Sequence, residues 1–75
     1  MARRNDLDSY PLLNGAAIRR ARRAAGLSQF ELAVNVGVTP QAVQRWESGE
    51  IKCVSKERLR SICSALIVRA EEIVR

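Results

Sequence analysis

Residues 26–49 read GLSQFELAVNVGVTPQAVQRWESG, and this stretch predicts two short helices joined by a tight turn. The first helix is expected over residues 28–36. Ser28 begins it and Glu31 follows three residues later, which is the spacing of a capping box, in which each side chain accepts a hydrogen bond from the other residue's backbone N–H. Gly37 ends it, because glycine takes up the left-handed conformation of a tight turn without steric cost.

The second helix of the pair is expected over residues 39–48. Thr39 can cap its N-terminus, and Pro40 occupies the first helical position, where its missing N–H costs nothing. Val43 and Trp46 are three residues apart and therefore face inward together. Two short helices joined by a glycine turn are typical of a helix-turn-helix, whose second helix enters the major groove of DNA.

The rest of the chain also favours helices. Residues 15–25 follow a capping side chain at Asn14, residues 56–66 follow one at Ser55, and a short last helix is expected over residues 70–75. The alternation of apolar and polar residues that indicates strands does not occur in the sequence. We therefore expect an all-α fold with five helices.

Length and composition limit the kinds of protein to which the chain can belong. Its 75 residues suffice for one domain, with an N-terminal arm over residues 1–13 and the DNA-binding domain over residues 14–75. The sequence has no histidine, the commonest general base, and its two cysteines, Cys53 and Cys63, are too few for a disulfide scaffold or a zinc site. We therefore expect no enzyme, cofactor, metal or small-molecule ligand. No apolar run approaches the roughly 18–20 residues that span a bilayer, so we expect a cytoplasmic, nucleoid-associated protein and no membrane partner.

The net charge of +5 is unevenly distributed along the chain. It is +4 over residues 1–27, −2 over residues 28–50 and +3 over residues 51–75. A small basic chain without catalytic groups is typical of proteins that bind an anion, with nucleic acid as the leading candidate. Because the predicted helix pair is itself negative, we expect the flanking basic residues to supply attraction and a few side chains of the pair to supply specificity.

Five motifs together make the chain resemble the lambdoid phage repressor and Cro-type helix-turn-helix family. They are IRxxR from Ile18, GLSQxELA from Gly26, VGVT from Val36, VxxWExG from Val43 and LxxICxAL from Leu59, and the resemblance covers about residues 14–73. It implies a compact five-helix bundle and a transcriptional regulator, either a repressor or a Cro-like protein. It also implies a homodimer that binds a pseudo-palindromic operator in double-stranded DNA.

Three side chains of the helix at 39–48 are the candidate base readers: Gln41, Gln44 and Arg45. A glutamine can bond adenine at N6 and N7, and an arginine can bond guanine at O6 and N7. Their positions are similar to those that read bases in the family. Pro40 stands where many relatives have a polar base reader, and it can offer only van der Waals contact. The alternative for all three is an ordinary solvated face.

Contacts to the DNA backbone are expected from side chains around this helix. Gln29 stands at a helix N-terminus, where free N–H groups and the helix dipole attract a phosphate. The resemblance also implies that Arg22 and Glu47 form an internal ion pair that holds the helix at 39–48 in place. The candidate backbone contacts are Gln29, Thr39, Arg22, Lys52, Lys56, Arg3 and Arg4.

Several residues depart from the family pattern. Glu50 stands where relatives often carry a basic or small polar residue, and Ile67 replaces the glycine that usually follows the fourth helix. With Val68 and Val74, Ile67 predicts an apolar edge, which serves either a dimer contact or the packing of the last helix. Phe30 lies away from the inward face of its helix, so it either packs locally or meets a partner.

Two other functions are compatible with these residues. An antitoxin of a toxin–antitoxin pair would use the same DNA-binding fold together with a protein partner. A helical interaction domain without DNA binding is favoured only by the negative charge of the central segment.

Overall fold

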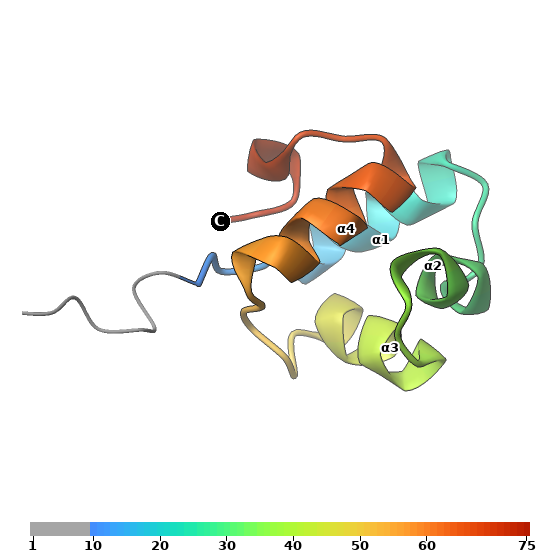
Figure 1. Cartoon of the computed structure of the whole chain (residues 1–75), viewed down its shortest axis with the longest axis horizontal. Helices are drawn as coiled ribbons and strands as arrows, with labels where there is room; N and C mark the ends of the chain where they lie inside the picture. The colour runs from blue at the N-terminus through green and yellow to red at the C-terminus, as the bar shows by residue number, and fades with distance from the viewer. Residues whose placement is uncertain (1–9) are drawn as a thin grey trace, which may run out of the picture.

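Four α-helices form the described part of the molecule: α1 (Gly15–Ala24), α2 (Gln29–Val36), α3 (Pro40–Ser48) and α4 (Lys56–Leu66) (Figure 1). This computed structural model describes residues 10–75. α2 packs against both α3 and α4, and α3 also packs against α1. Within residues 10–75 there is no strand, and the all-α expectation is confirmed.

The prediction of a fifth α-helix over residues 70–75 was wrong. A single 3-10 turn, η2 (Ala70–Glu72), stands there instead. The chain beyond it is hydrogen bonded to the segment before α1: Asn14 N–H donates to the Ile73 carbonyl at 2.8 Å, and Arg75 N–H donates to the Leu12 carbonyl at 2.9 Å. A six-residue helix forms too few internal bonds to offset its nucleation cost, so these longer-range bonds prevail.

The capping side chains expected from the sequence are confirmed. Ser28 and Glu31 form both bonds of a capping box, at 3.0 Å and 2.8 Å. Thr39 Oγ1 accepts from the Ala42 N–H at 3.2 Å. Asn14 and Ser55 cap α1 and α4 in the same way. The ends of the four helices consequently lie within one residue of their predicted positions.

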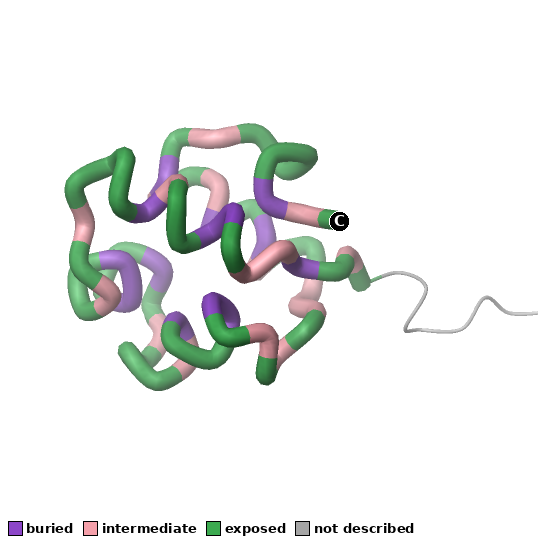
Figure 2. Tube along the Cα trace, turned by 180° about the vertical axis from the view of Figure 1, so that it is seen from behind, coloured by how far each residue is buried: buried purple, intermediate pink, exposed green. Residues whose placement is uncertain are grey.

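The core lies between the four helices and includes residues from both ends of the described chain. Figure 2 shows the buried positions turned toward the middle of the molecule. Leu13, the last residue of the expected N-terminal arm, is buried, as is Ile73 after η2. The buried apolar residues are Leu13, Ala17, Ile18, Leu32, Ala33, Val36, Val43, Trp46, Leu59, Ile62, Leu66 and Ile73.

α1 and α3 approach each other unusually closely at Gly15. A Cβ atom at that position would lie 2.5 Å from the Trp46 carbonyl oxygen and 2.6 Å from that of Glu47. These are backbone atoms, which cannot move aside as a flexible side chain can. Gly15 therefore sets the distance between the start of α1 and the end of α3.

Candidate nucleic-acid interface

The three candidate base readers share the solvent-facing side of α3. Gln41, Gln44 and Arg45 are all exposed, and their spacing of three and four residues places them on one face of the helix. Val43 and Trp46 are buried on the opposite side. α3 thus presents a polar face whose donors and acceptors are available to a ligand.

Arg45 has an acidic neighbour that the sequence did not indicate. Its Nε lies 3.6 Å from Oε2 of Glu50, and both side chains are more than half exposed. The loop after α3 turns back at this point, because Ile51 N–H donates to the Arg45 carbonyl at 3.1 Å. The one candidate base reader with a positive charge is therefore paired with a carboxylate.

A buried ion pair joins α3 to α1. Arg22 donates from both Nε and Nη2 to the carboxylate of Glu47, the second bond measuring 3.2 Å. The Glu47 side chain is 1% exposed and that of Arg22 is 11% exposed. Arg22 Nη1 also donates to the Leu27 carbonyl at 2.9 Å. The guanidinium therefore bonds both the end of α3 and the connection between α1 and α2.

Two further side chains converge on Glu47. Gln29 Nε2 donates to its Oε1 at 3.1 Å, and Arg19 Nε lies 3.5 Å from the same oxygen. The half-buried Gln29 stands at the start of α2, so its amide is oriented by a bond to α3. The Glu47 carboxylate thus links three helices: α1, α2 and α3.

This network shifts the pKa values of both partners. Burial alone would raise the pKa of the Glu47 carboxyl, but the hydrogen bonds from Arg22 and Gln29 and the charge of Arg22 outweigh it, so the pKa is lowered. The pKa of Arg22 is raised, chiefly by its hydrogen bond to Glu47. Both groups are therefore charged at neutral pH.

The remaining candidates for backbone contacts lie apart from this network. Thr39 is exposed, with its hydroxyl oxygen engaged in capping α3. Lys52 and Lys56 are exposed on the connection to α4 and in its first turn, and Lys52 Nζ donates to the Gly49 carbonyl at 3.3 Å. Arg3 and Arg4 lie outside the described residues.

Other groups singled out from the sequence are placed as follows. Phe30 is 63% exposed on α2, one turn before Val34, which is 62% exposed. Cys53 and Cys63 are half-buried free thiols, and burial raises the pKa of Cys63. Over residues 10–75 no cluster of three or more potential metal ligands occurs, and no helix is long and apolar enough to cross a membrane.

Comparisons with known proteins give consistent results. Residues 18–73 match the helix-turn-helix family. A protein of Pyrobaculum aerophilum, described as an HTH-type transcriptional regulatory protein, is 46% identical over 44 residues. That match covers 59% of this chain and 18% of the relative, so the chain spans less than a fifth of the relative's length.

Two solved structures are similar over most of their length. The clp gene regulator ClgR from Corynebacterium glutamicum is 36% identical with a TM-score of 0.69, and the match covers 77% of this chain and 74% of that one. The P22 c2 repressor, solved in complex with a synthetic operator, is 30% identical with a TM-score of 0.72. Its match covers 79% of this chain and 88% of the repressor chain.

Proposed function

The chain belongs to the helix-turn-helix family of λ-repressor type, and from this premise we propose that it is a sequence-specific regulator of transcription that reads double-stranded DNA with α3. The observation that carries the proposal is the exposed row of Gln41, Gln44 and Arg45 on a helix fixed from behind by Glu47.

Each of these three side chains pairs with a particular base. Arg45 bonds O6 and N7 of a guanine, and Gln41 and Gln44 each bond N6 and N7 of an adenine. Residues 14–75 serve as the DNA-binding domain, and the small side chain of Ala42 next to the row allows α3 to lie deep in the major groove.

The backbone of the DNA is held on both sides of α3. Gln29, whose amide is oriented by Glu47, and Thr39, at the start of α3, donate to phosphates on one side of the groove. Lys52 and Lys56 bind phosphates from the connection to α4. Arg22, the buried partner of Glu47, and Arg3 and Arg4 of the arm complete the proposed set of backbone contacts.

We further propose that two copies bind together. A single α3 reads only a few base pairs, and a two-fold symmetric pair reads two half-sites about one helical turn, roughly 34–36 Å, apart. The operator is then pseudo-palindromic.

Selection of binding sites from randomised DNA tests the proposal directly. The wild-type chain should enrich one sequence with two related half-sites. At that sequence Arg45→Ala should lower discrimination at one base pair by about 1–3 kcal/mol, measured by titration against each substituted site.

Arg23→Ala is the matched control, because Arg23 is an exposed arginine on α1 outside the proposed contacts. It should leave discrimination at every base pair unchanged. If Arg45→Ala instead weakens binding by the same factor on all sequences, Arg45 contacts the backbone and not a base. If the wild-type chain enriches no sequence, the proposed function fails.

An antitoxin is the second candidate function. Phe30 and Val34 favour it, because they form an exposed apolar pair on one face of α2. A toxin would cover this pair while α3 remains free for DNA. Co-expression with the product of the neighbouring gene should then yield a complex that Phe30→Ser disrupts, and purification of the chain alone after co-expression would argue against this function.

A further inference from the structure

Ile67 combines two unfavourable features at one position. It ends α4 in the left-handed conformation, with φ 57° and ψ 53°, and its side chain is 88% exposed. A β-branched residue in this conformation is a steric outlier, and glycine would occupy it without strain. Burial within the chain does not compensate for this strain, so the position gains from an isoleucine only if something outside the chain covers it.

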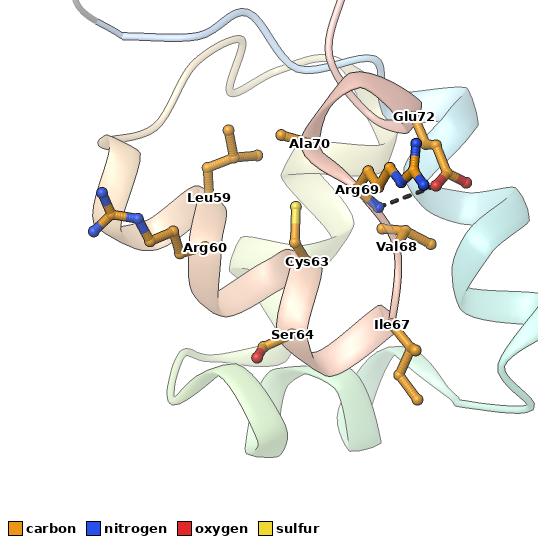
Figure 3. Close-up of a pocket in the computed structure, with 9 residues that line it drawn as sticks. All are labelled: Leu59, Arg60, Cys63, Ser64, Ile67, Val68, Arg69, Ala70 and Glu72. Carbon is orange, nitrogen blue, oxygen red and sulfur yellow. Dashed lines mark hydrogen bonds between the residues drawn. The ribbon is translucent and has the colours of Figure 1, made fainter.

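Three shallow hollows surround this side chain. One lies between α4 and η2, one between α4 and the C-terminal end of α2, and one between α1 and the residues that follow α4. Ile67 borders all three. In Figure 3 its side chain points away from Leu59 and Cys63, which line the first hollow. A protruding apolar side chain and an apolar hollow therefore lie next to each other on one face.

This arrangement suits a second copy of the same chain. In a two-fold symmetric interface the same surface meets itself, so a protrusion must have a matching hollow nearby. We propose that Ile67 of one copy inserts into the hollow between α4 and η2 of the other copy, and that the reciprocal contact forms across the axis. The inference rests on the homodimer of the proposed function and assigns its interface.

The charges around the hollow favour the same occupant. Arg60, Arg69 and Glu72 line it, and Arg69 forms an exposed ion pair with Glu71 at 3.8 Å. A patch that carries both signs can face its own copy without net repulsion. Nucleic acid would instead require a clear excess of positive charge, whereas Glu71 and Glu72 balance the two arginines of the hollow.

The interface leaves the candidate DNA surface uncovered. α3 packs against α1 and α2, whereas the hollow is built from α4 and η2. A dimer formed through Ile67 therefore keeps Gln41, Gln44 and Arg45 exposed in both copies.

Two substitutions separate this contact from a role in folding. Ile67→Gly removes the side chain and relieves the left-handed strain, and Ile67→Asn places a polar residue that tolerates this conformation. For both variants sedimentation equilibrium should give a dimer dissociation constant at least about 10-fold higher than that of the wild type, because the symmetric dimer loses the Ile67 contact in both copies. In dilute solution, where all variants are monomers, Ile67→Gly should melt several degrees higher than the wild type.

Val34→Asn is the matched control. Val34 is also an exposed apolar residue, on α2, and valine and asparagine have similar helix propensities. The dimer dissociation constant of this variant should equal that of the wild type. Weakening of dimerisation equal to that of Ile67→Asn would overturn the proposal, as would an Ile67→Gly variant that dimerises like the wild type.

DNA binding distinguishes failure of the interface from failure of the proposed function. A wild-type chain that binds its selected DNA but remains a monomer at every protein concentration overturns the interface alone. A wild-type chain that dimerises through Ile67 but enriches no DNA sequence supports the interface and overturns the proposed function.

Discussion

The carboxylate of Glu47, which is almost closed to solvent, accepts hydrogen bonds from Arg22 and Gln29 and lies 3.5 Å from Nε of the half-exposed Arg19. The ion pair between Arg22 and Glu47 chiefly orients α3 and adds little net stability, because the cost of desolvating two charges offsets much of their attraction. Removal of one partner is strongly destabilising, because the other charge then stays buried without a partner. The pair therefore makes α3 sensitive to the protonation of a single residue.

Glu47→Gln should lower the free energy of unfolding at pH 7 by about 3–5 kcal/mol, because it leaves the Arg22 charge buried and unpaired. In the wild type, the folded-state pKa of Glu47 lies below the unfolded value of about 4.3, so its contribution is complete above that pH. The contribution is lost as the pH falls through the lower, folded pKa. Urea unfolding across this acidic range measures the effect.

The variant provides the control for the pH dependence. Because glutamine does not titrate, the fall in stability between about pH 5 and pH 3 should be shallower in Glu47→Gln than in the wild type. Equal slopes in the two proteins would mean that Glu47 does not contribute to acid unfolding.

Glu50 should act on specificity through Arg45. Its carboxylate competes with DNA for the guanidinium and repels phosphates nearby. A guanine that offers two hydrogen bonds outcompetes the carboxylate more readily than a non-cognate base does. We therefore expect Glu50→Gln to raise affinity for random-sequence DNA several-fold, by more than it raises affinity for the selected site.

Glu71→Gln is the matched control, since Glu71 also belongs to an exposed arginine–glutamate pair but lies on η2. It makes the same change in net charge, and because it lies beside the proposed dimer contact and away from α3, any effect on affinity should be equal for random DNA and for the selected site. Fluorescence anisotropy with both DNAs measures the ratio of affinities. An unchanged ratio for Glu50→Gln would show that the Arg45–Glu50 pair has no influence on specificity.

At the residue scale the sequence was informative where local rules or a family motif apply. The resemblance indicated a pair between Arg22 and Glu47, and the structure contains one. It gave no sign that Gln29 would bond Glu47, or that Glu50 would reach Arg45, because both contacts depend on how segments fold back on each other. The roles proposed for Gln41, Gln44 and Arg45 in DNA binding stay predictions.

At the scale of the helices, the contact between α1 and α3 depends on the absence of a side chain at Gly15. Helix propensity alone would favour alanine there by about 1 kcal/mol. The clash of a Cβ atom with two carbonyl oxygens of α3 opposes this preference, and relief requires the two helices to separate. We expect Gly15→Ala to destabilise the fold by about 1–3 kcal/mol, measured by urea unfolding.

The adjacent residue supplies the control. Ala16 is exposed in the same turn of α1, and Ala16→Gly should cost only the propensity difference, about 0.5–1 kcal/mol. Gly15→Ala and Ala16→Gly are opposite substitutions at neighbouring positions, and both are expected to destabilise the fold. A Gly15→Ala variant more stable than the wild type would show that α1 and α3 can adjust their distance freely.

Capping signals located α1 to α4 because a cap is a local interaction among residues three apart. For the last element no cap was identified, and the helix expected over residues 70–75 does not form. Ile73 is buried, as an inward helical residue would be, but the backbone there is held by Asn14 from the other end of the chain. The backbone partner of this segment lies about 60 residues away in the chain, so local sequence patterns could not indicate it.

Over the whole molecule, net charge and recognition are carried by different parts. Residues 28–50, which include α2 and α3, have a net charge of −2, and the flanking segments carry the positive excess. Attraction to a polyanion must therefore come mostly from residues outside the helix pair. Lys52 and Lys56 are the exposed basic residues that follow α3 most closely in the chain.

The separation of the positive charge from the helix that reads the bases predicts how DNA binding should respond to salt. Each phosphate neutralised by a lysine adds about −0.9 to the slope of log K against log salt concentration. Lys56→Gln should therefore make the slope shallower by about one and weaken binding by a similar factor on the selected site and on random DNA. Titrations at several salt concentrations measure both quantities.

Arg23→Gln makes the same change in net charge at an exposed position on α1 and separates a direct phosphate contact from a general effect of charge. If Lys56 touches a phosphate, only its substitution alters the slope, because a counterion is released only where a charge meets the backbone closely. Equal changes in both variants would mean that the positive charge attracts DNA diffusely from the whole surface. A loss confined to the selected site would instead assign Lys56 a part in reading sequence, and the separation between attraction and recognition would not hold.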